Sequence, residues 1–194
     1  SLRDMRAATA IRVRPHILAC AVAQYGAGIR PPFKDDNLPE LLQQVLAHPD
    51  TLITLVPGAD WMMCGPCPTR IPGAGDCSGG KQGTQGLYNT LKDLNVLQAA
   101  GWTYGLTLPA RRLFRELFDR VPEVAGVCAL APSISGLSVW ADSCGRAASP
   151  CPDYRVGRER LLKEFGFLPT VEVEEEVYAV GPMDNGAGPM WCHG

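Results

Sequence analysis

The chain has 194 residues, of which 46% are hydrophobic and 20% are charged, and its formal net charge is -2. The hydrophobic fraction excludes an intrinsically disordered chain, and the near-neutral charge argues against a protein that coats nucleic acid or an anionic membrane. No uninterrupted apolar run approaches the length of a membrane span. We therefore expect one compact domain over residues 1–194 that binds neither nucleic acid nor a membrane.

The first half of the chain predicts two strands and two helices. Apolar and basic residues alternate over 11–14, which is typical of a short strand, and the apolar segment 16–25 indicates a buried helix. Asn37 and Glu40 have the spacing of a capping box at the start of an amphipathic helix that Pro49 ends. Residues 51–56 predict the second strand.

The segment 64–86 carries cysteines and many glycines, so we expect it to be a loop. A helix is predicted from about Leu87 to Ala100, with Gly101 as its C-cap. Thr107 is expected to cap the next helix.

A second loop region is expected from Cys128 to Pro152. Asp153 is expected to cap a helix that Gly166 ends, and residues 170–180 predict an acidic strand. Taken together, the pattern predicts an α+β fold that is mostly helical, with a few short strands and cysteine-rich loops around a metal cluster.

The cysteine count is the unusual feature of the composition, because this chain has eight. An even number indicates disulfides in a short secreted domain and metal or redox chemistry in a cytosolic protein. Charged residues interrupt the first ten positions, so no signal peptide is visible, and a chain of this length does not need disulfides to fold. We therefore favour metal binding and a cytoplasmic location.

Four cysteines have a spacing that suits one cofactor. Cys64 and Cys67 form a C-x2-C pair, Cys77 follows in a glycine-rich segment, and Cys20 lies far away in the first predicted helix. Three local cysteines and one remote cysteine are typical of a [4Fe–4S] cluster. A structural zinc site usually shows two short pairs, so zinc is the alternative.

The other four cysteines have a looser spacing with no second C-x2-C pair. They either form a second cluster site, which would give two clusters in the chain, or are buried thiols without a ligand role. These residues are Cys128, Cys144, Cys151 and Cys192.

His16 is the candidate catalytic residue, because it precedes Cys20 by four positions and so shares one face of the predicted helix with it. It is a candidate cluster ligand, proton donor or substrate contact. A structural histidine bonded to the backbone at the start of the helix is an equally good interpretation.

These motifs resemble a prokaryotic family of domains of unknown function for which iron–sulfur binding has been proposed. The family motifs R-P-H-x3-C and C-x2-C-P match at Arg14 to Cys20 and at Cys64 to Pro68, and a lone cysteine matches at Cys77. The resemblance covers residues 11–144 and implies a [4Fe–4S] cluster on Cys20, Cys64, Cys67 and Cys77. Ser138 stands where the family has a cysteine, and residues 152–194 are a chain-specific extension.

The cysteine pattern leaves three functions open. The first is a redox or electron-transfer protein that works with a redox partner protein. The second is an iron–sulfur enzyme in which an open iron acts as a Lewis acid or reductant on a small polar substrate. The third is a zinc-stabilised interaction module.

Overall fold

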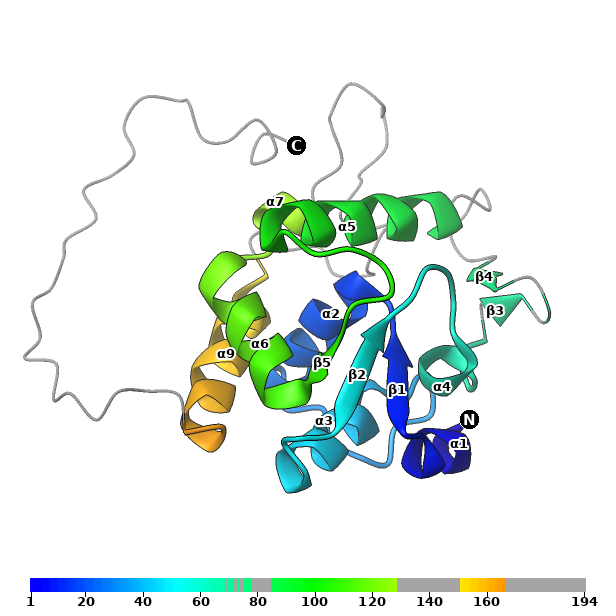
Figure 1. Cartoon of the computed structure of the whole chain (residues 1–194), viewed down its shortest axis with the longest axis horizontal. Coiled ribbons are helices and arrows are strands. Elements are labelled where there is room, and N and C mark those ends of the chain that lie inside the picture. Colours follow the sequence, from blue (N-terminus) through cyan, green and yellow to red (C-terminus); the bar gives the residue numbers. More distant parts are fainter. Residues whose placement is uncertain (69, 72, 74, 78–84, 129–150, 167–194) are drawn as a thin grey trace, which may run out of the picture.

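The computed structural model describes residues 1–68, 70–71, 73, 75–77, 85–128 and 151–166, and they form an α+β fold in which helices predominate (Figure 1). The predicted fold class is therefore confirmed. In chain order the elements are α1 (Leu2–Ala7), β1 (Ala10–Val13), α2 (Pro15–Gly26), α3 (Leu38–Ala47), β2 (Leu52–Leu55), α4 (Trp61–Cys64), β3 (Arg70–Ile71), β4 (Asp76–Cys77), α5 (Gln85–Ala100), β5 (Thr107–Pro109), α6 (Ala110–Arg120), α7 (Ala125–Cys128) and α9 (Pro152–Glu164).

The central sheet has the strand order β1-β2-β5. β1 and β2 are parallel, with Val13 opposite Leu55, and β5 is antiparallel to β2, with Thr107 opposite Thr54. Buried residues alternate along β1 and β2, so one face of the sheet packs on the core and the other is more polar. On the polar face the hydroxyls of Thr54 and Thr107 lie 2.8 Å apart.

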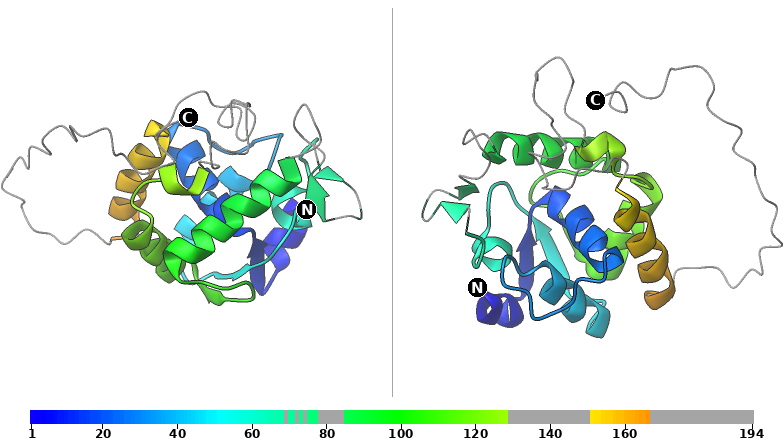
Figure 2. Two further views of the ribbon diagram at one scale, coloured as in Figure 1. Left: turned by 90° about the horizontal axis from the view of Figure 1, so that it is seen from above. Right: turned by 180° about the vertical axis from the view of Figure 1, so that it is seen from behind.

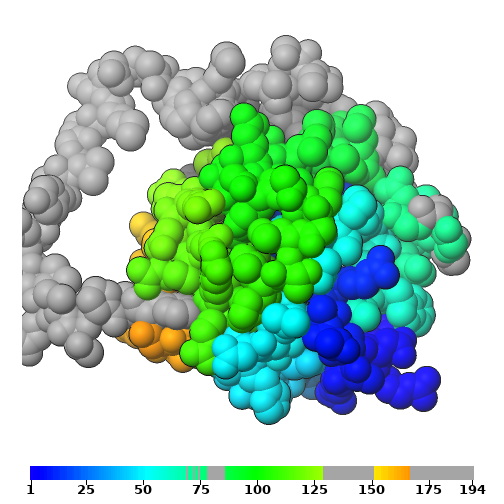
Figure 3. Space-filling model, in the orientation of Figure 1, coloured from blue at the N-terminus to red at the C-terminus, as the bar shows by residue number. Residues whose placement is uncertain are grey.

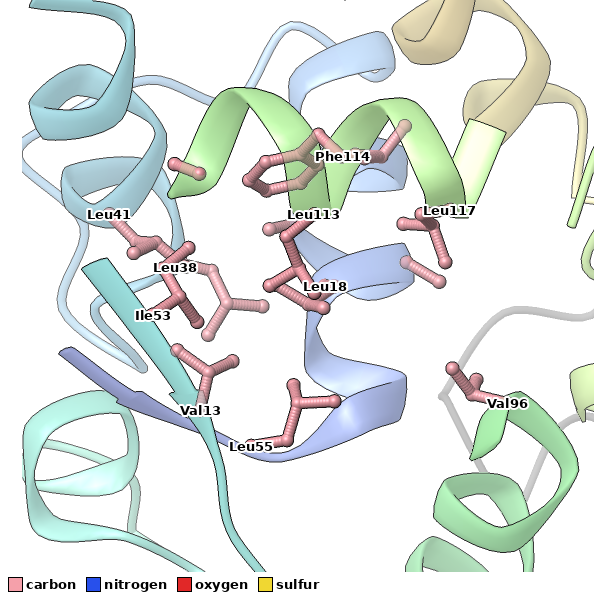
Figure 4. Packing of buried hydrophobic residues seen from close by; sticks show 14 of the residues in the cluster. Val13, Leu18, Leu38, Leu41, Ile53, Leu55, Val96, Leu113, Phe114 and Leu117 are labelled. Carbon is pink, nitrogen blue, oxygen red and sulfur yellow. The ribbon is translucent and has the colours of Figure 1, made fainter. Parts of the chain in front are cut away.

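The hydrophobic core lies between this sheet and the helices. Seen from behind in Figure 2, α2 and α3 lie in front of the sheet, with α9 alongside α2. Figure 4 shows apolar side chains from these layers meeting, among them Val13 and Ile53 from the sheet, Leu18 from α2 and Phe114 from α6. One buried cluster extends from Met5 to Leu161, so both ends of the described chain belong to the same core.

The contact between α2 and α9 depends on two glycines. A Cβ atom at Gly26 would lie 1.8 Å from the carbonyl oxygen of Asp153, and one at Gly157 would lie 2.0 Å from that of Val22. These separations are too short for any side chain, so only glycine allows the two backbones to approach this closely. The helix after the second cysteine-bearing segment is thereby fixed against the first half of the chain.

The short helix α4 covers the outer edge of β1. The backbone N–H of Arg12 donates to the Sδ atom of Met62 at 3.5 Å, and the Arg12 guanidinium pairs with Asp60 at 3.1 Å. Asp60 also caps α4, because its carboxylate accepts from the N–H of Met62 at 2.8 Å. The last residue of α4 is Cys64, so this packing also places the first cysteine of the C-x2-C pair.

Three expected caps are wrong in detail. Thr107 begins β5 and does not cap a helix, because residues 107–109 pair with β2 and Pro109 becomes the N-cap of α6. Cys151 and not Asp153 is the N-cap of α9. Asn37 does occupy the N-cap of α3, but its amide donates to the carbonyl of Met62, so no capping box forms.

The expected loop over 64–86 is also wrong in part, because it contains the end of α4, the β3–β4 pair and the start of α5. The first helix, α1, has no counterpart among the predicted elements. By contrast, Gly101 and Gly166 follow helices with φ values of +64° and +66°, as expected of glycines after a helix. The predicted strand at 170–180 lies outside the described residues.

The space-filling view shows that α5, α6 and the segment between them make up much of one face of the molecule (Figure 3). Among the described residues, no helix is long and apolar enough to cross a membrane.

Candidate metal centre

The three local cysteines are brought together by a short turn and a strand pair. The N–H of Cys67 donates to the carbonyl of Cys64 at 3.1 Å, which closes a turn after α4, and the N–H of Arg70 donates to the carbonyl of Cys67 at 3.2 Å. Arg70 is directly opposite Cys77 in the β3–β4 pair. The turn after α4 and the β3–β4 pair therefore connect Cys64 to Cys77 through local backbone contacts.

The thiols of these cysteines are close enough to influence one another. Burial raises the pKa of Cys64 to about 12, and the neighbouring groups of Cys77 and Cys67 add to the rise. Burial also raises the pKa of Cys77, while the guanidinium of Arg14 acts in the opposite direction. In the metal-free protein at neutral pH, the Cys64 and Cys77 thiols are therefore protonated, and binding of a metal would release their protons.

Asn89 of α5 reaches this group from the other side. Its side-chain amide donates to the Sγ atom of Cys77 at 3.8 Å, and Asn89 itself is buried. An N–H group directed at a cysteine sulfur stabilises negative charge on that sulfur.

A buried ion pair lies next to the thiols. The Nε atom of Arg14 donates to Oδ2 of Asp93 at 2.7 Å, and the two side chains are 2% and 0% exposed. A second nitrogen of the guanidinium contacts the hydroxyl of Thr90 at 3.5 Å. Because Arg14 lowers the pKa values of both Cys64 and Cys77, its positive charge acts directly on the cysteine group.

His16 is bonded to the same carboxylate. Its backbone N–H donates to Oδ1 of Asp93 at 3.1 Å, and its ring Nδ1 atom lies 2.6 Å from that oxygen. Burial would raise the pKa of Asp93, but the hydrogen bond from His16 and the charge of Arg14 hold it below its usual value. Burial lowers the pKa of His16 and outweighs the attraction of Asp93.

These shifts define the state of the imidazole at neutral pH. Asp93 is ionised and can only accept, so the Nδ1 atom of the neutral His16 ring carries the proton. The Nε2 atom is then the basic ring nitrogen. Asp93 thus fixes both the orientation and the tautomer of His16.

A second basic side chain lies among these buried residues. Lys92 is also buried, and its charge lowers the pKa of His16. Within the described residues its charge adds to that of Arg14 near Asp93. An anionic thiolate or cluster beside these residues would therefore be stabilised.

Cys20, the predicted fourth ligand, lies half-buried in α2, one turn after His16. This spacing places it on the side of the helix from which His16 reaches Asp93. It packs against the same hydrophobic core as Cys64, Cys67 and Cys77.

Two cysteines of the looser set lie beside Tyr154. The N–H of Tyr154 donates to the carbonyl of Cys151 at 3.2 Å. Burial raises the pKa of Tyr154, and Cys128 adds to the rise. Cys144 and Cys192, the other members of the predicted second site, lie outside the described residues.

No disulfide joins any two of the cysteines in the described part of the chain. Within the same residues, no three His, Cys, Asp or Glu side chains lie close enough together to hold a single metal ion. The cysteine group is therefore defined by the electrostatic influence of its thiols on one another and by the backbone contacts between its residues. It is not defined by a complete set of metal ligands.

Comparison of the chain with protein-family models, curated proteins and solved structures gave no match. The family resemblance of the sequence motifs therefore stays a prediction.

Sequence reasoning missed the α5 side of this centre, namely Asn89, Lys92 and Asp93. The available signal was their spacing, since these positions share one helix face with the buried Val96. Two leucines of the same helix point elsewhere, because Leu87 is 61% and Leu94 is 48% exposed.

Proposed function

We propose that this protein binds a [4Fe–4S] cluster through Cys64, Cys67 and Cys77, with Cys20 as the fourth ligand, and acts in redox or electron transfer. The observation that carries the proposal is the electrostatic influence of Cys64, Cys67 and Cys77 on one another beside a buried guanidinium and a buried amide donor. Such a protein would exchange electrons with a redox partner protein.

The chemistry of the side chains fits such a cluster. Thiolates are the usual ligands of iron–sulfur clusters, and net charge and hydrogen bonds to sulfur tune their potentials. Arg14 supplies positive charge that acts on Cys64 and Cys77, and Asn89 supplies an N–H to Cys77. When bound, the cluster would supply one-electron transfer, or Lewis acidity if one iron lacks a cysteine ligand.

A second candidate function is an iron–sulfur enzyme that acts on a small polar substrate. The observation that favours it is the His16–Asp93 pair, because a neutral imidazole with a fixed tautomer is suited to accept or donate a proton. In this alternative His16 is the candidate catalytic residue, and Cys20 does not complete the cluster.

The proposal includes a cytoplasmic location, supported by the lack of a disulfide between any two described cysteines. It also allows a second cluster on Cys128, Cys144, Cys151 and Cys192.

The test is the iron, sulfide and zinc content of anaerobically purified protein, together with its visible spectrum. About four irons and four sulfides per chain indicate one cluster, and about twice that amount indicates two. Cys67→Ser should lose the first cluster, whereas Cys151→Ser should retain it. Colourless protein that contains zinc would instead favour a zinc-stabilised interaction module, and protein without either metal would overturn the proposal.

The two iron–sulfur functions differ in their response to an added ligand. If one iron is open, cyanide should change the electron paramagnetic resonance spectrum of the reduced protein, which would favour the enzyme. If four cysteines complete the cluster, the spectrum should stay the same, and Cys20→Ser should make it sensitive to cyanide.

A further inference from the structure

A second group of polar side chains lies between the last turn of α2 and the first half of α3. The side-chain amide of Gln24 donates to Oδ2 of Asp36 at 2.8 Å, and the N–H of Leu38 donates to Oδ1 of Asp36 at 3.0 Å. One turn into α3, Oε1 of Glu40 accepts from the N–H of Phe33 at 2.9 Å. This group is separate from the cysteine centre, and it does not depend on the proposed function.

Three oxygen atoms in this group are buried without a hydrogen-bond partner in the described part of the chain. They are Oε1 of Gln24, Oε2 of Glu40 and Oε1 of Gln44. All three are acceptors. Gln44 follows Glu40 by one helical turn, so the oxygens of Glu40 and Gln44 lie on the same side of α3. Buried acceptors without a donor are unfavourable, so each calls for a ligand.

Among these residues Glu40 gives the strongest indication of a bound ligand, because its side chain carries an unpartnered oxygen and the residue is only 6% exposed. Its charge contributes to a raised pKa of Asp36, for which burial is the main cause, so the two carboxylates repel each other. The N-terminal dipole of α3 favours both carboxylates but supplies no donor to Oε2 of Glu40. A cation between the carboxylates would remove the repulsion and satisfy that oxygen.

We propose that Gln24, Asp36, Glu40 and Gln44 form a binding site for a hard divalent cation, Ca²⁺ or Mg²⁺. Carboxylates and amide carbonyls are the oxygen ligands that such cations use, and two carboxylates balance one divalent charge. Both oxygens of Asp36 retain lone pairs beyond those used by Gln24 and Leu38. The cation would join α2 to α3 at the end of α2 where the helix dipole is negative.

Thermal unfolding with and without the cation tests the proposal. Protein dialysed against a chelator is melted alone, with CaCl₂, with MgCl₂ and with NaCl of matched ionic strength. A cation that binds only the folded state should raise the midpoint by about 2–4 °C or more above the NaCl sample. The salt that gives the larger rise identifies the preferred cation.

Glu40→Gln is the decisive variant, because it keeps the shape of the side chain and removes its charge. We expect it to lose the cation-dependent rise and, in chelator, to melt no lower than the wild type, since the buried repulsion has gone. Glu159→Gln, an exposed position on α9, should keep the full rise. Cys64→Ser should keep it as well, because a hard cation does not select thiols.

Either of two results would overturn the inference. One is a midpoint that responds no more to CaCl₂ and MgCl₂ than to NaCl, which would mean that water alone meets the three oxygens. The other is a rise of equal size in wild type and Glu40→Gln, which would place the cation elsewhere.

Discussion

Replacing Asp93 with asparagine should destabilise this protein far more than the same replacement at Asp119. Both aspartates accept from an arginine Nε atom, at 2.7 Å from Arg14 and at 2.9 Å from Arg115. They differ in surroundings, because Asp93 is 0% exposed and Asp119 is 55% exposed. The pair of variants therefore isolates the effect of burial on one chemical change.

The expected magnitude follows from the contacts of each oxygen of Asp93. Oδ1 accepts from His16 and Oδ2 accepts from Arg14, so an asparagine in either orientation turns its NH₂ group toward a donor. The guanidinium of Arg14 would also lose its countercharge. Breaking a buried pair in this way costs about 3–5 kcal/mol, whereas an exposed helical pair contributes about 0.3–0.5 kcal/mol.

Urea unfolding of the wild type and both variants, in the same buffer and metal state, measures the free energies of unfolding. A loss of about 3–5 kcal/mol is a large share of the 5–15 kcal/mol typical of a folded protein. The double variant Arg14→Met/Asp93→Leu should recover part of the loss, because the charge of Arg14 is removed together with that of its partner. The reasoning is refuted if Asp93→Asn and Asp119→Asn differ by less than about 1 kcal/mol.

Three other predictions concern the helix contact, the imidazole and the sulfur donor. Gly157→Ala should lower the melting temperature, because its Cβ would lie 2.0 Å from the carbonyl of Val22, and an overpacked contact typically costs 1–3 kcal/mol; an unchanged calorimetric midpoint would contradict it. Because burial lowers the pKa of His16, the unfolded chain takes up a proton first as the pH falls through the ordinary value of 6.5. The wild type should therefore lose at most about 1 kcal/mol more than His16→Gln between pH 6.5 and 5.5, and parallel urea-derived stability curves would argue against a neutral buried ring. In cluster-loaded protein, Asn89→Leu should lower the reduction potential measured by voltammetry, since Cys77 loses an N–H donor, and an unchanged potential would show that this contact does not tune the cluster.

Local patterns in the sequence predict most of the elements, because their causes are local. The alternation at 11–14 and the apolar stripe after Asn37 each act within a few residues, and both elements form. The expected cap at Thr107 failed for a non-local reason. Residues 107–109 pair with β2, whose residues lie more than fifty positions earlier in the chain. Because of this strand pairing, α6 begins only at Ala110.

The cysteine side of the centre was predictable and the α5 side was not. The C-x2-C spacing fixes a turn between Cys64 and Cys67, so their proximity follows from the sequence. Asp93 lies 79 residues from Arg14, and the signal within α5 is limited to the spacing that places its polar residues on one helix face with Val96. The leucines of α5 instead suggest burial of Leu87 and Leu94, which are exposed because the fold directs the Asn89–Asp93 face toward the cysteines.

The packing of α4 on β1 also bears on self-association. In the three-stranded sheet β1 is an outer strand, and an uncovered outer strand offers unpaired N–H and C=O groups to other chains. Met62 and Asp60 cover this edge through their contacts with Arg12, and they belong to the segment that leads into Cys64. Oxidation of the cysteines, or loss of a metal bound to them, would therefore also disturb the packing of α4 on β1. We expect displacement of this segment to uncover the edge of β1 and to favour pairing of that strand with other chains.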